Sequence, residues 1–335
     1  MNKLLLILIP ILLICFWIDL AVGSIAIPPL EVWNSLIGND VSKASWESII
    51  INYRLPRAVT AILAGIGLSL SGLFMQSFFR NPLAGPFVLG ISSGASLGVA
   101  VLVLGGALFP FLLIGSWGVV FSSITGASLV FLVVLIFSKY VNNNTSLLII
   151  GLMFSSATGA IVSVLQYFSA PENIQAYLIW TFGDLGGVTK AELWVMTPIM
   201  LGAILASVLL IKPLNILQLG EDYAKNAGLN IQKARYGIVF ITAVLAGTIT
   251  AFCGPIAFIG LAVPHITRMI LDVSDHKKIL PVTAILGAIV LLFCDVISRM
   301  PGFAQTLPLN AITSLFGGPL VIWLIIKRKN LHHSF

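Results

Sequence analysis

Long apolar runs, each close to the width of a bilayer, alternate along the chain with shorter polar segments. The runs are continuously apolar rather than alternating residue by residue, a pattern typical of membrane-spanning helices rather than barrel strands. A helix pairs its own backbone amides, as the interior of a bilayer requires. We therefore predict an all-α integral membrane protein. Its ten expected spans are 4–25, 57–78, 87–107, 111–138, 147–168, 191–211, 236–256, 258–271, 280–297 and 307–326.

Two polar segments interrupt this series of spans. The segment 26–56 carries Trp33, Trp46 and several isoleucines at helical spacing, which predicts amphipathic helices at the outer membrane surface. The segment 212–235 is the longest polar stretch and is expected in the cytoplasm. We treat residues 1–335 as a single transmembrane domain to which both segments belong.

Charge sets the expected orientation. Only 9% of the residues are charged and 58% are hydrophobic, whereas a soluble protein carries roughly 25% charged residues. If both termini are cytoplasmic, most Lys and Arg residues fall inside, as the positive-inside rule favours. The outer side then holds only Lys43, Arg54, Arg57, Lys190 and Arg299. We expect a multi-pass protein of the bacterial inner membrane.

The first apolar run has an alternative interpretation. Residues 1–23 could be a cleaved signal peptide that ends at the small residues AVG (21–23), which would leave nine spans.

Two stretches of the chain are similar to each other. TAILAGIGLSLSG (60–72) and TAVLAGTITAFCG (242–254) share six positions, and the same offset aligns Pro82 with Pro264. The stretches lie five spans apart and would cross the membrane in opposite directions. This predicts an inverted repeat of spans 2–5 and 7–10. The alternative is chance similarity between helices rich in small residues.

Sequence patterns that bind nucleotides or catalyse reactions are missing. No GxxxxGK[ST] or HExxH occurs, and GISSG (90–94) matches GxSxG without the α/β sheet that a nucleophile elbow requires. We interpret Gly90, Gly94 and Gly98 instead as a surface for close helix packing. The cysteines and the lone His265 lack metal-ligand spacing. We expect no catalytic residue, metal site, cofactor or nucleic-acid partner.

The charged residues within the spans lie near their ends. Asp19 and Asp295 are close to outer ends, and Arg80 and Arg268 are close to inner ends. A secondary transporter, the alternative class of function, would carry ion-coupling groups near mid-span. The energy for transport is therefore expected to come from a partner.

Several long stretches resemble one family of transporters. They include RLPR (54–57), AGIGLSLSGLFMQSFFRNPLAGPFVLGISSGASLG (64–98), LNILQLGEDYAKNAGL (214–229), GPIAFIGLAVPHITR (254–268) and LPLNAITSLFGGPLVIWLI (307–325). In order and over nearly the whole chain, they resemble the FecCD-type permeases, the membrane subunits of ABC importers for iron–siderophores, haem and vitamin B12. Asn310 departs from the glycine usual in this family, and Val321 from the phenylalanine.

The resemblance implies a set of partners. A second copy of the chain would form a homodimer, two ATP-binding subunits would hydrolyse ATP, and a periplasmic or lipid-anchored protein would deliver the substrate. The implied substrate is a metal chelate, with an iron(III)–siderophore as our main expectation and vitamin B12 or haem as alternatives. Membrane lipid surrounds the chain.

The resemblance also implies a docking site and an inner gate. Arg54, Arg57 and Arg299 would be exposed at the outer face and bind glutamates of the delivering protein, with interfacial anchoring as the alternative. The gate would use short polar and apolar side chains, with ordinary turns as the alternative. The expected gate residues are Asn81, Leu83, Asn144 and Thr145.

The third implied site contacts the ATP-binding subunit. A polar helix is expected from Gly220-Glu221, with its apolar side chains in a groove of the partner and Asp222, Lys225 and Asn226 in water. A solvated loop is the alternative. The expected coupling residues are Leu219, Gly220, Glu221, Tyr223, Ala227, Gly228 and Leu229.

Overall fold

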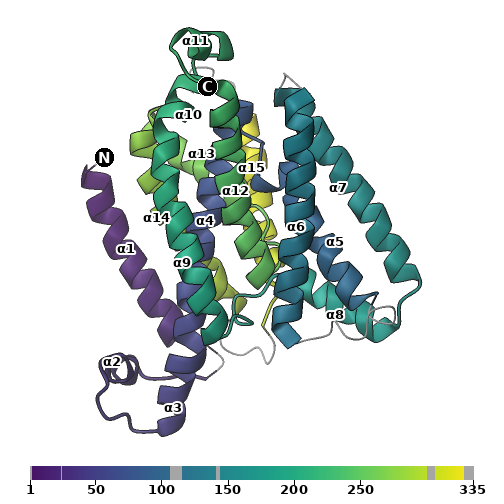
Figure 1. The fold of residues 1–335 in the computed structure, drawn as a ribbon. Coiled ribbons are helices and arrows are strands. Elements are labelled where there is room, and N and C mark those ends of the chain that lie inside the picture. The colour runs from purple at the N-terminus through teal and green to yellow at the C-terminus, as the bar shows by residue number, and fades with distance from the viewer. Residues whose placement is uncertain (1, 24, 106–114, 141–143, 300–305, 328–335) are drawn as a thin grey trace.

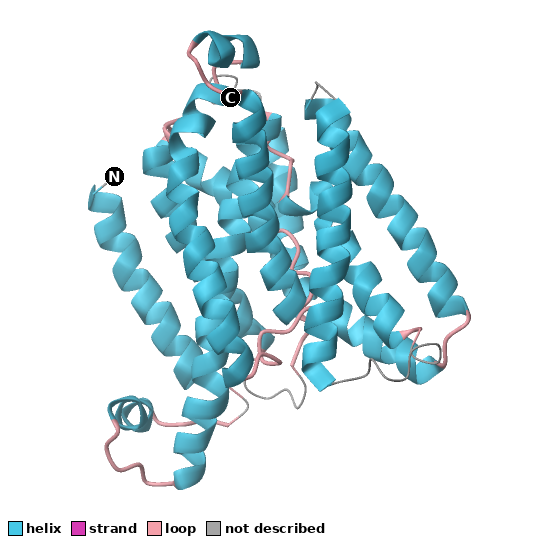
Figure 2. Ribbon diagram, viewed as in Figure 1, coloured by secondary structure: helices cyan, strands magenta, loops and turns pink. Residues whose placement is uncertain are grey.

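A computed structural model describes residues 2–23, 25–105, 115–140, 144–299 and 306–327, and within them every regular element is helical (Figures 1 and 2). The elements are α1 (Asn2–Ala21), α2 (Pro29–Ile37), α3 (Ala44–Ile49), the π-helical turn η1 (Ile50–Arg54), α4 (Leu55–Phe79), the 3₁₀ turn η2 (Pro86–Leu89), α5 (Ile91–Val103), α6 (Gly115–Tyr140), α7 (Asn144–Tyr167), α8 (Pro171–Thr181), α9 (Lys190–Ser207), the 3₁₀ turn η4 (Val208–Leu210), α10 (Ile211–Leu217), α11 (Glu221–Asn226), α12 (Ile231–Cys253), α13 (Ile259–Leu271), α14 (His276–Ser298) and α15 (Leu309–Lys327).

The all-α membrane fold is confirmed. Seven helical stretches of the described chain are long and apolar enough to cross a bilayer. The shorter apolar helices α5, α13 and α15 occupy the remaining predicted positions. The second span was predicted to begin at residue 57. In the structure, α3, η1 and α4 form one continuous apolar helical stretch over Ala44–Phe79, so this helix extends into the segment 26–56.

Helix α4 runs through the centre of the bundle, and almost all of its length is buried. Small residues allow this position, because they let neighbouring backbones approach closely. A Cβ atom on Gly65 would lie 2.3 Å from the Gly287 carbonyl oxygen of α14. A Cβ atom on Gly72 would lie 1.6 Å from the Gly260 carbonyl oxygen of α13. These contacts fix α4 against two helices at once.

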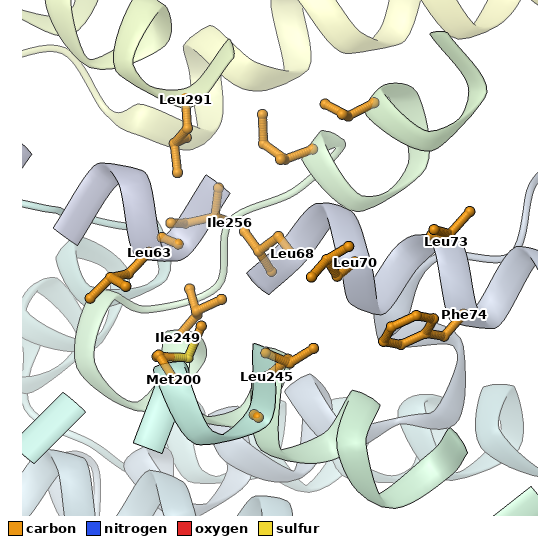
Figure 3. Close-up of a cluster of buried hydrophobic side chains, with 14 of the residues drawn as sticks. Leu63, Leu68, Leu70, Leu73, Phe74, Met200, Leu245, Ile249, Ile256 and Leu291 are labelled. Carbon is orange, nitrogen blue, oxygen red and sulfur yellow. The ribbon is translucent and has the colours of Figure 1, made fainter. Parts of the chain in front are cut away.

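Apolar side chains fill the space around α4. Figure 3 shows Leu68, Leu70 and Phe74 of α4 in one buried cluster with Met200 of α9 and Leu245 of α12. Buried residues of α13 and α14, among other helices, belong to the same core.

A second group of helices is formed by α5, α6 and α7 (Figure 1). Gly94 and Gly98 of α5 face α6, where added Cβ atoms would lie 2.5 Å from the Gly126 carbonyl oxygen and 2.0 Å from that of Ser122. Gly90 has a positive φ of 74° and lies opposite the Gly151 carbonyl oxygen of α7. The three glycines therefore lie where α5 meets both neighbours.

The two ends of the bundle carry different elements (Figure 1). Helices α2, α3 and α8 lie at one end, and α10 and α11 lie at the other. The predicted surface helices of segment 26–56 correspond to α2 and α3. Segment 212–235 contains most of α10 and all of α11, and α11 projects beyond the rest of the bundle.

The proposed match of Pro82 with Pro264 is not reflected in local structure. Helix α4 continues to Phe79 and Pro82 lies in the turn that follows it, whereas Pro264 lies inside α13. The difference arises because α12 already ends at Cys253, before Gly254 with its positive φ of 73°. The inverted repeat of spans 2–5 and 7–10 stays a prediction.

Candidate docking, gate and coupling sites

Arg57 and Asp295 form the centre of a buried ion-pair network at the end of the bundle that holds α2 and α3. Arg57 Nε donates to both carboxylate oxygens of Asp295, at 2.9 and 3.0 Å, and Nη2 donates to Oδ1 at 2.8 Å. Its remaining Nη1 lies 3.7 Å from Asp184. Such a forked contact fixes the guanidinium plane. One edge of Arg57 is therefore held inside while the other faces the loop 182–189.

Arg299 and Arg54 bind the C-terminal end of α1. Arg299 Nη2 contacts the carboxylates of Asp19 and, at 2.7 Å, Asp295. Arg54 donates to the carbonyl oxygens of Leu20 at 2.8 Å and Ala21 at 2.7 Å. Carbonyl groups at a helix C-terminus lack intrahelical partners and attract cations. These two arginines therefore satisfy the end of α1.

The expectation that these three arginines are exposed is wrong. Arg54 is 5% exposed, and the side chains of Arg57 and Arg299 are 13% and 8% exposed. The reason is that Asp19, Asp295 and the end of α1 supply enough acceptors to hold the guanidinium groups inside. These partners could not be predicted from local sequence, since Arg57 and Asp295 are 238 positions apart.

The same arginines nevertheless line a cavity. It has a volume of about 310 Å³, and its walls include Arg54, Arg57, Arg299, Tyr53 and Gly186. Two of the three guanidinium charges are balanced inside by the buried carboxylates of Asp19 and Asp295. The third carboxylate, Asp184, lies 3.7 Å from Arg57 Nη1 and is 59% exposed, so an acidic ligand at this cavity would compete with Asp184 for Arg57.

The gate prediction concerns the turn after α4. Arg80 ends α4 with a φ of 47°, and the Asn81 side chain accepts a hydrogen bond from the Leu83 backbone N–H at 3.0 Å. Leu83 is 45% exposed. Asn144 and Thr145 form the first residues of α7, but their side chains lie outside the described part of the structure. The gate role of these two residues, together with Asn81 and Leu83, stays a prediction.

The predicted coupling segment forms a short projecting helix. Gly220, with a φ of 120°, precedes α11, and Gly228, with a φ of 79°, follows it. Leu219 and Tyr223 are exposed, at 64% and 56%. Ala227 and Gly228 are exposed too, whereas Leu229 is half-buried. The segment thus presents apolar side chains to its surroundings.

Two arginines attach this segment to the bundle. Arg80 Nη2 donates to the Leu217 carbonyl oxygen at 2.6 Å, which joins the end of α4 to the end of α10. Arg235 of α12 lies 3.8 Å from the Glu221 carboxylate at the start of α11. Glu221 therefore has an internal contact as well as a place in the coupling segment.

Sequence reasoning missed a polar side-chain cluster beside α10. Ser77, Asn215 and His276 come from α4, α10 and α14 and are joined by hydrogen bonds of 2.7 Å. Each residue alone has an ordinary sequence context, so only their meeting in space marks them.

Asn310, the departure from the family pattern, joins two loops. Its Nδ2 donates to the carbonyl oxygens of Thr181 at 2.8 Å and Pro255 at 2.6 Å, and its Oδ1 accepts from Ala257 N at 2.8 Å. A glycine at this position could not make these side-chain bonds. The residue therefore holds the end of α8 against the connection between α12 and α13.

The described residues do not form a cluster suited to a metal ion. No group of three or more His, Cys, Asp or Glu side chains is close enough there to hold a metal ion. Cys15, Cys253 and Cys294 are free thiols.

Comparison with known proteins supplies the family. The sequence model of the FecCD transport family matches residues 11–327. The chain belongs to the FecCD transport family. The haemin transport system permease HmuU of Yersinia pestis is 35% identical over 320 residues, which is 95% of each chain. The vitamin B12 import system permease BtuC of Klebsiella pneumoniae is 36% identical over 323 residues, covering 95% of this chain and 92% of that one.

Solved structures agree with this FecCD assignment. A metal-chelate type ABC transporter in an inward-facing conformation matches 98% of this chain and 100% of its own, with a TM-score of 0.85 and 29% identity. PsaBC of Streptococcus pneumoniae matches with a TM-score of 0.54 at 17% identity and supports the fold alone. This FecCD protein is thus a permease subunit of an ABC importer for metal chelates, haem or vitamin B12, and ATP is hydrolysed by a partner.

Proposed function

We propose that the chain imports an iron(III)–siderophore as a homodimer with two ATP-binding subunits. The observation that carries the proposal is the whole-length similarity to a metal-chelate type transporter. A chelate hides the charge of its metal, so its path needs no fixed counter-charge. This agrees with the placement of Asp19, Asp295, Arg80 and Arg268 at the ends of their helices. Haem and vitamin B12 are the alternative substrates, because relatives named for each are similarly identical.

Uptake by living cells distinguishes these substrates. We expect that deletion of the gene abolishes uptake of a radiolabelled iron(III)–siderophore and leaves cobalamin and haem uptake unchanged. Re-expression of the chain should restore it. Loss of cobalamin or haem uptake instead would overturn the siderophore assignment and identify the alternative.

The arginine-lined cavity is the proposed contact for the substrate-binding protein, which places α2 and α3 on the outer face. An acidic side chain of that protein would meet the outward edge of Arg57, where Nη1 lies 3.7 Å from the exposed Asp184 and the other two guanidinium groups line the same cavity. The contact is charge-assisted and therefore depends on ionic strength. Arg54 and Arg299 shape the cavity wall.

Charge reversal is a poor test here, because a carboxylate at position 57 would face the buried Asp295. We instead compare Arg57→Lys with Asp184→Asn in a binding assay with the purified substrate-binding protein. Lys keeps a charge but cannot contact Asp295 and also present a second N–H edge outward, so docking should weaken by about tenfold. Asp184→Asn removes a competing anion and should leave docking equal or tighter. Unchanged affinity in Arg57→Lys would contradict the docking role.

The coupling segment is the proposed contact for the ATP-binding subunit, which places α11 and both termini in the cytoplasm. Tyr223 of α11 and Leu219, in the turn before α11, are exposed and would enter a groove of the partner. Leu219→Ala and Tyr223→Ala should each reduce the amount of ATP-binding subunit that copurifies with the chain. Asp222→Ala, whose side chain is fully exposed, is the matched control and should not. Equal copurification of all three variants would contradict this contact.

A further inference from the structure

Polar side chains form a continuous hydrogen-bonded chain at the α10 end of the bundle. Arg268 Nη2 lies 2.7 Å from Ser77 Oγ, and Ser77 Oγ lies 2.7 Å from His276 Nε2. His276 Nδ1 lies 2.7 Å from Asn215 Oδ1, and Asn215 Nδ2 lies 2.8 Å from Asp275 Oδ1. The chain thus crosses from α13 through α4 and α14 to α10 and ends just before α14.

Donor and acceptor chemistry gives this polar chain a single direction. A carboxylate oxygen and an amide oxygen can only accept hydrogen bonds. Asn215 Oδ1 therefore accepts from His276 Nδ1–H, which leaves Nε2 as the acceptor for the Ser77 hydroxyl. The Ser77 oxygen in turn accepts from Arg268. The bonds run from a cation to an anion, and each intermediate side chain donates once and accepts once along the path.

Burial makes this chain of hydrogen-bonded side chains stiff. Ser77, His276 and Arg268 are all buried, so water cannot take the place of a lost partner. Hydrogen bonds in such a low-dielectric environment are strong, and a broken one leaves an unsatisfied group. A displacement of Asn215 must therefore be followed by His276 and Ser77, or the bonds are lost together.

The polar chain includes Asn215 of α10, which lies directly before the coupling segment. It reaches Ser77, three residues before Arg80, where α4 ends and the turn with Asn81 and Leu83 begins. Arg80 also holds the Leu217 carbonyl oxygen, so α10 and the end of α4 are joined at two separate points. A movement of α10 can therefore be transmitted to this turn through both connections.

We propose that Asn215, His276 and Ser77 are positioning residues that transmit movement of α10 and α11 to the inner ends of α4 and α13. This rests on the proposed contact between α11 and the ATP-binding subunit. Packed elements joined by a stiff polar network shift as a unit, and this converts a movement at one site into a movement at the other. An ATP-driven shift of α11 would thereby move the turn that contains Leu83 and change the accessibility of this residue.

The test follows Leu83 in the full complex with its copurifying ATP-binding subunit. Leu83→Cys is introduced as a reporter, and its labelling rate by a water-soluble maleimide is measured with and without ATP. In this background we compare Ser77→Ala with Ser71→Ala. Ser71 is the matched control, since it is buried on the same helix and its hydroxyl bonds only to Leu68 of α4.

We expect ATP to change the labelling rate in the reporter background and equally in Ser71→Ala. Ser77→Ala should reduce this ATP-dependent change by roughly threefold or more, while ATP hydrolysis by the complex continues. Asn215→Ala should do the same, and Ser77→Thr, which restores a hydroxyl, should recover the response. A purely structural role would instead lower complex yield without altering the response of the assembled fraction.

Two outcomes would overturn the inference in distinguishable ways. An ATP response in Ser77→Ala and Asn215→Ala equal to that in Ser71→Ala would refute the positioning role and leave the proposed function intact. Failure of an ATP-binding subunit to copurify, or no ATP response in the reporter background itself, would overturn the proposed coupling contact and this inference together.

Discussion

Asp295→Asn gives the sharpest test of the ion-pair network between α4, α14 and α1. The Asp295 carboxylate accepts from Arg57 at 2.8–3.0 Å and contacts Arg299 at 2.7 Å, and it is fully buried. The substitution keeps the size of the side chain but removes its charge. Arg299 then keeps the carboxylate of Asp19, whereas Arg57, whose side chain is 13% exposed, keeps the exposed Asp184 at 3.7 Å. We expect lower stability because buried cations are left without sufficient counter-charge.

The size of the effect follows from burial. Removing one partner of a buried ion pair costs about 3–5 kcal/mol. At roughly 2 °C per kcal/mol for a chain of this length, the melting temperature in detergent should fall by about 6–10 °C. Asp184→Asn is the control, because Asp184 also pairs with Arg57 but only at 3.7 Å and with its side chain 59% exposed. An exposed pair contributes about 0–1 kcal/mol.

The melting temperature of each purified variant is measured from the loss of monodisperse protein on heating. The network account predicts a large loss for Asp295→Asn and a loss of no more than about 2 °C for Asp184→Asn. Equal melting temperatures for the two variants would refute the reasoning, because they would show that burial does not decide the contribution of these carboxylates.

Three further predictions concern packing, a loop junction and pH. Gly72→Ala should destabilise the protein by about 3 kcal/mol, seen as a lower melting temperature, since its Cβ would collide with Gly260 of α13. Asn310→Ala should speed hydrogen exchange in the loops at 181–182 and 255–257, because it removes the bonds that join them. Hydrogen bonds from the Lys277 amide and from α10 lower the pKa of Asp275. Its stabilisation of α10 should therefore be complete above pH about 4 and disappear as the pH falls through the lowered pKa, measured as faster α10 exchange.

Each of these predictions has its control. Gly202→Ala on α9 meets no atom within 4 Å and should leave stability equal or raise it by up to about 1 kcal/mol. Unchanged exchange in both loops of Asn310→Ala would contradict its role as a junction. For Asp275, an acid-induced rise in α10 exchange that persists in Asp275→Asn would show that another group is responsible.

The hydrophobic pattern predicted the membrane helices well, for physical reasons. A bilayer imposes both the length and the continuous apolar character of a span, so short-range sequence carries the information. The shorter α5, α13 and α15 were also located, although their lengths fall below that of a full span. The polar helix expected from Gly220-Glu221 corresponds to α11, Glu221–Asn226.

Contacts between distant segments were beyond the reach of that pattern. Arg57 was predicted as an exposed docking group, yet its principal partner is Asp295, which lies 238 positions later. Ser77 and His276 are 199 positions apart, and nothing near either one marks it as part of a polar chain. Helix packing alone brings such groups together. The family motifs indicated where function is concentrated, whereas the structure shows which internal bonds those residues already make.

ATP-driven uptake in proteoliposomes tests the central claim most directly. The chain is reconstituted alone, with its ATP-binding subunit, and with both that subunit and the substrate-binding protein, and entry of a radiolabelled iron(III)–siderophore is measured. The account predicts uptake only in the complete system and only with ATP inside the compartment that α11 faces. Uptake by the chain alone, independent of ATP and of both partners, would contradict it and favour a secondary transporter.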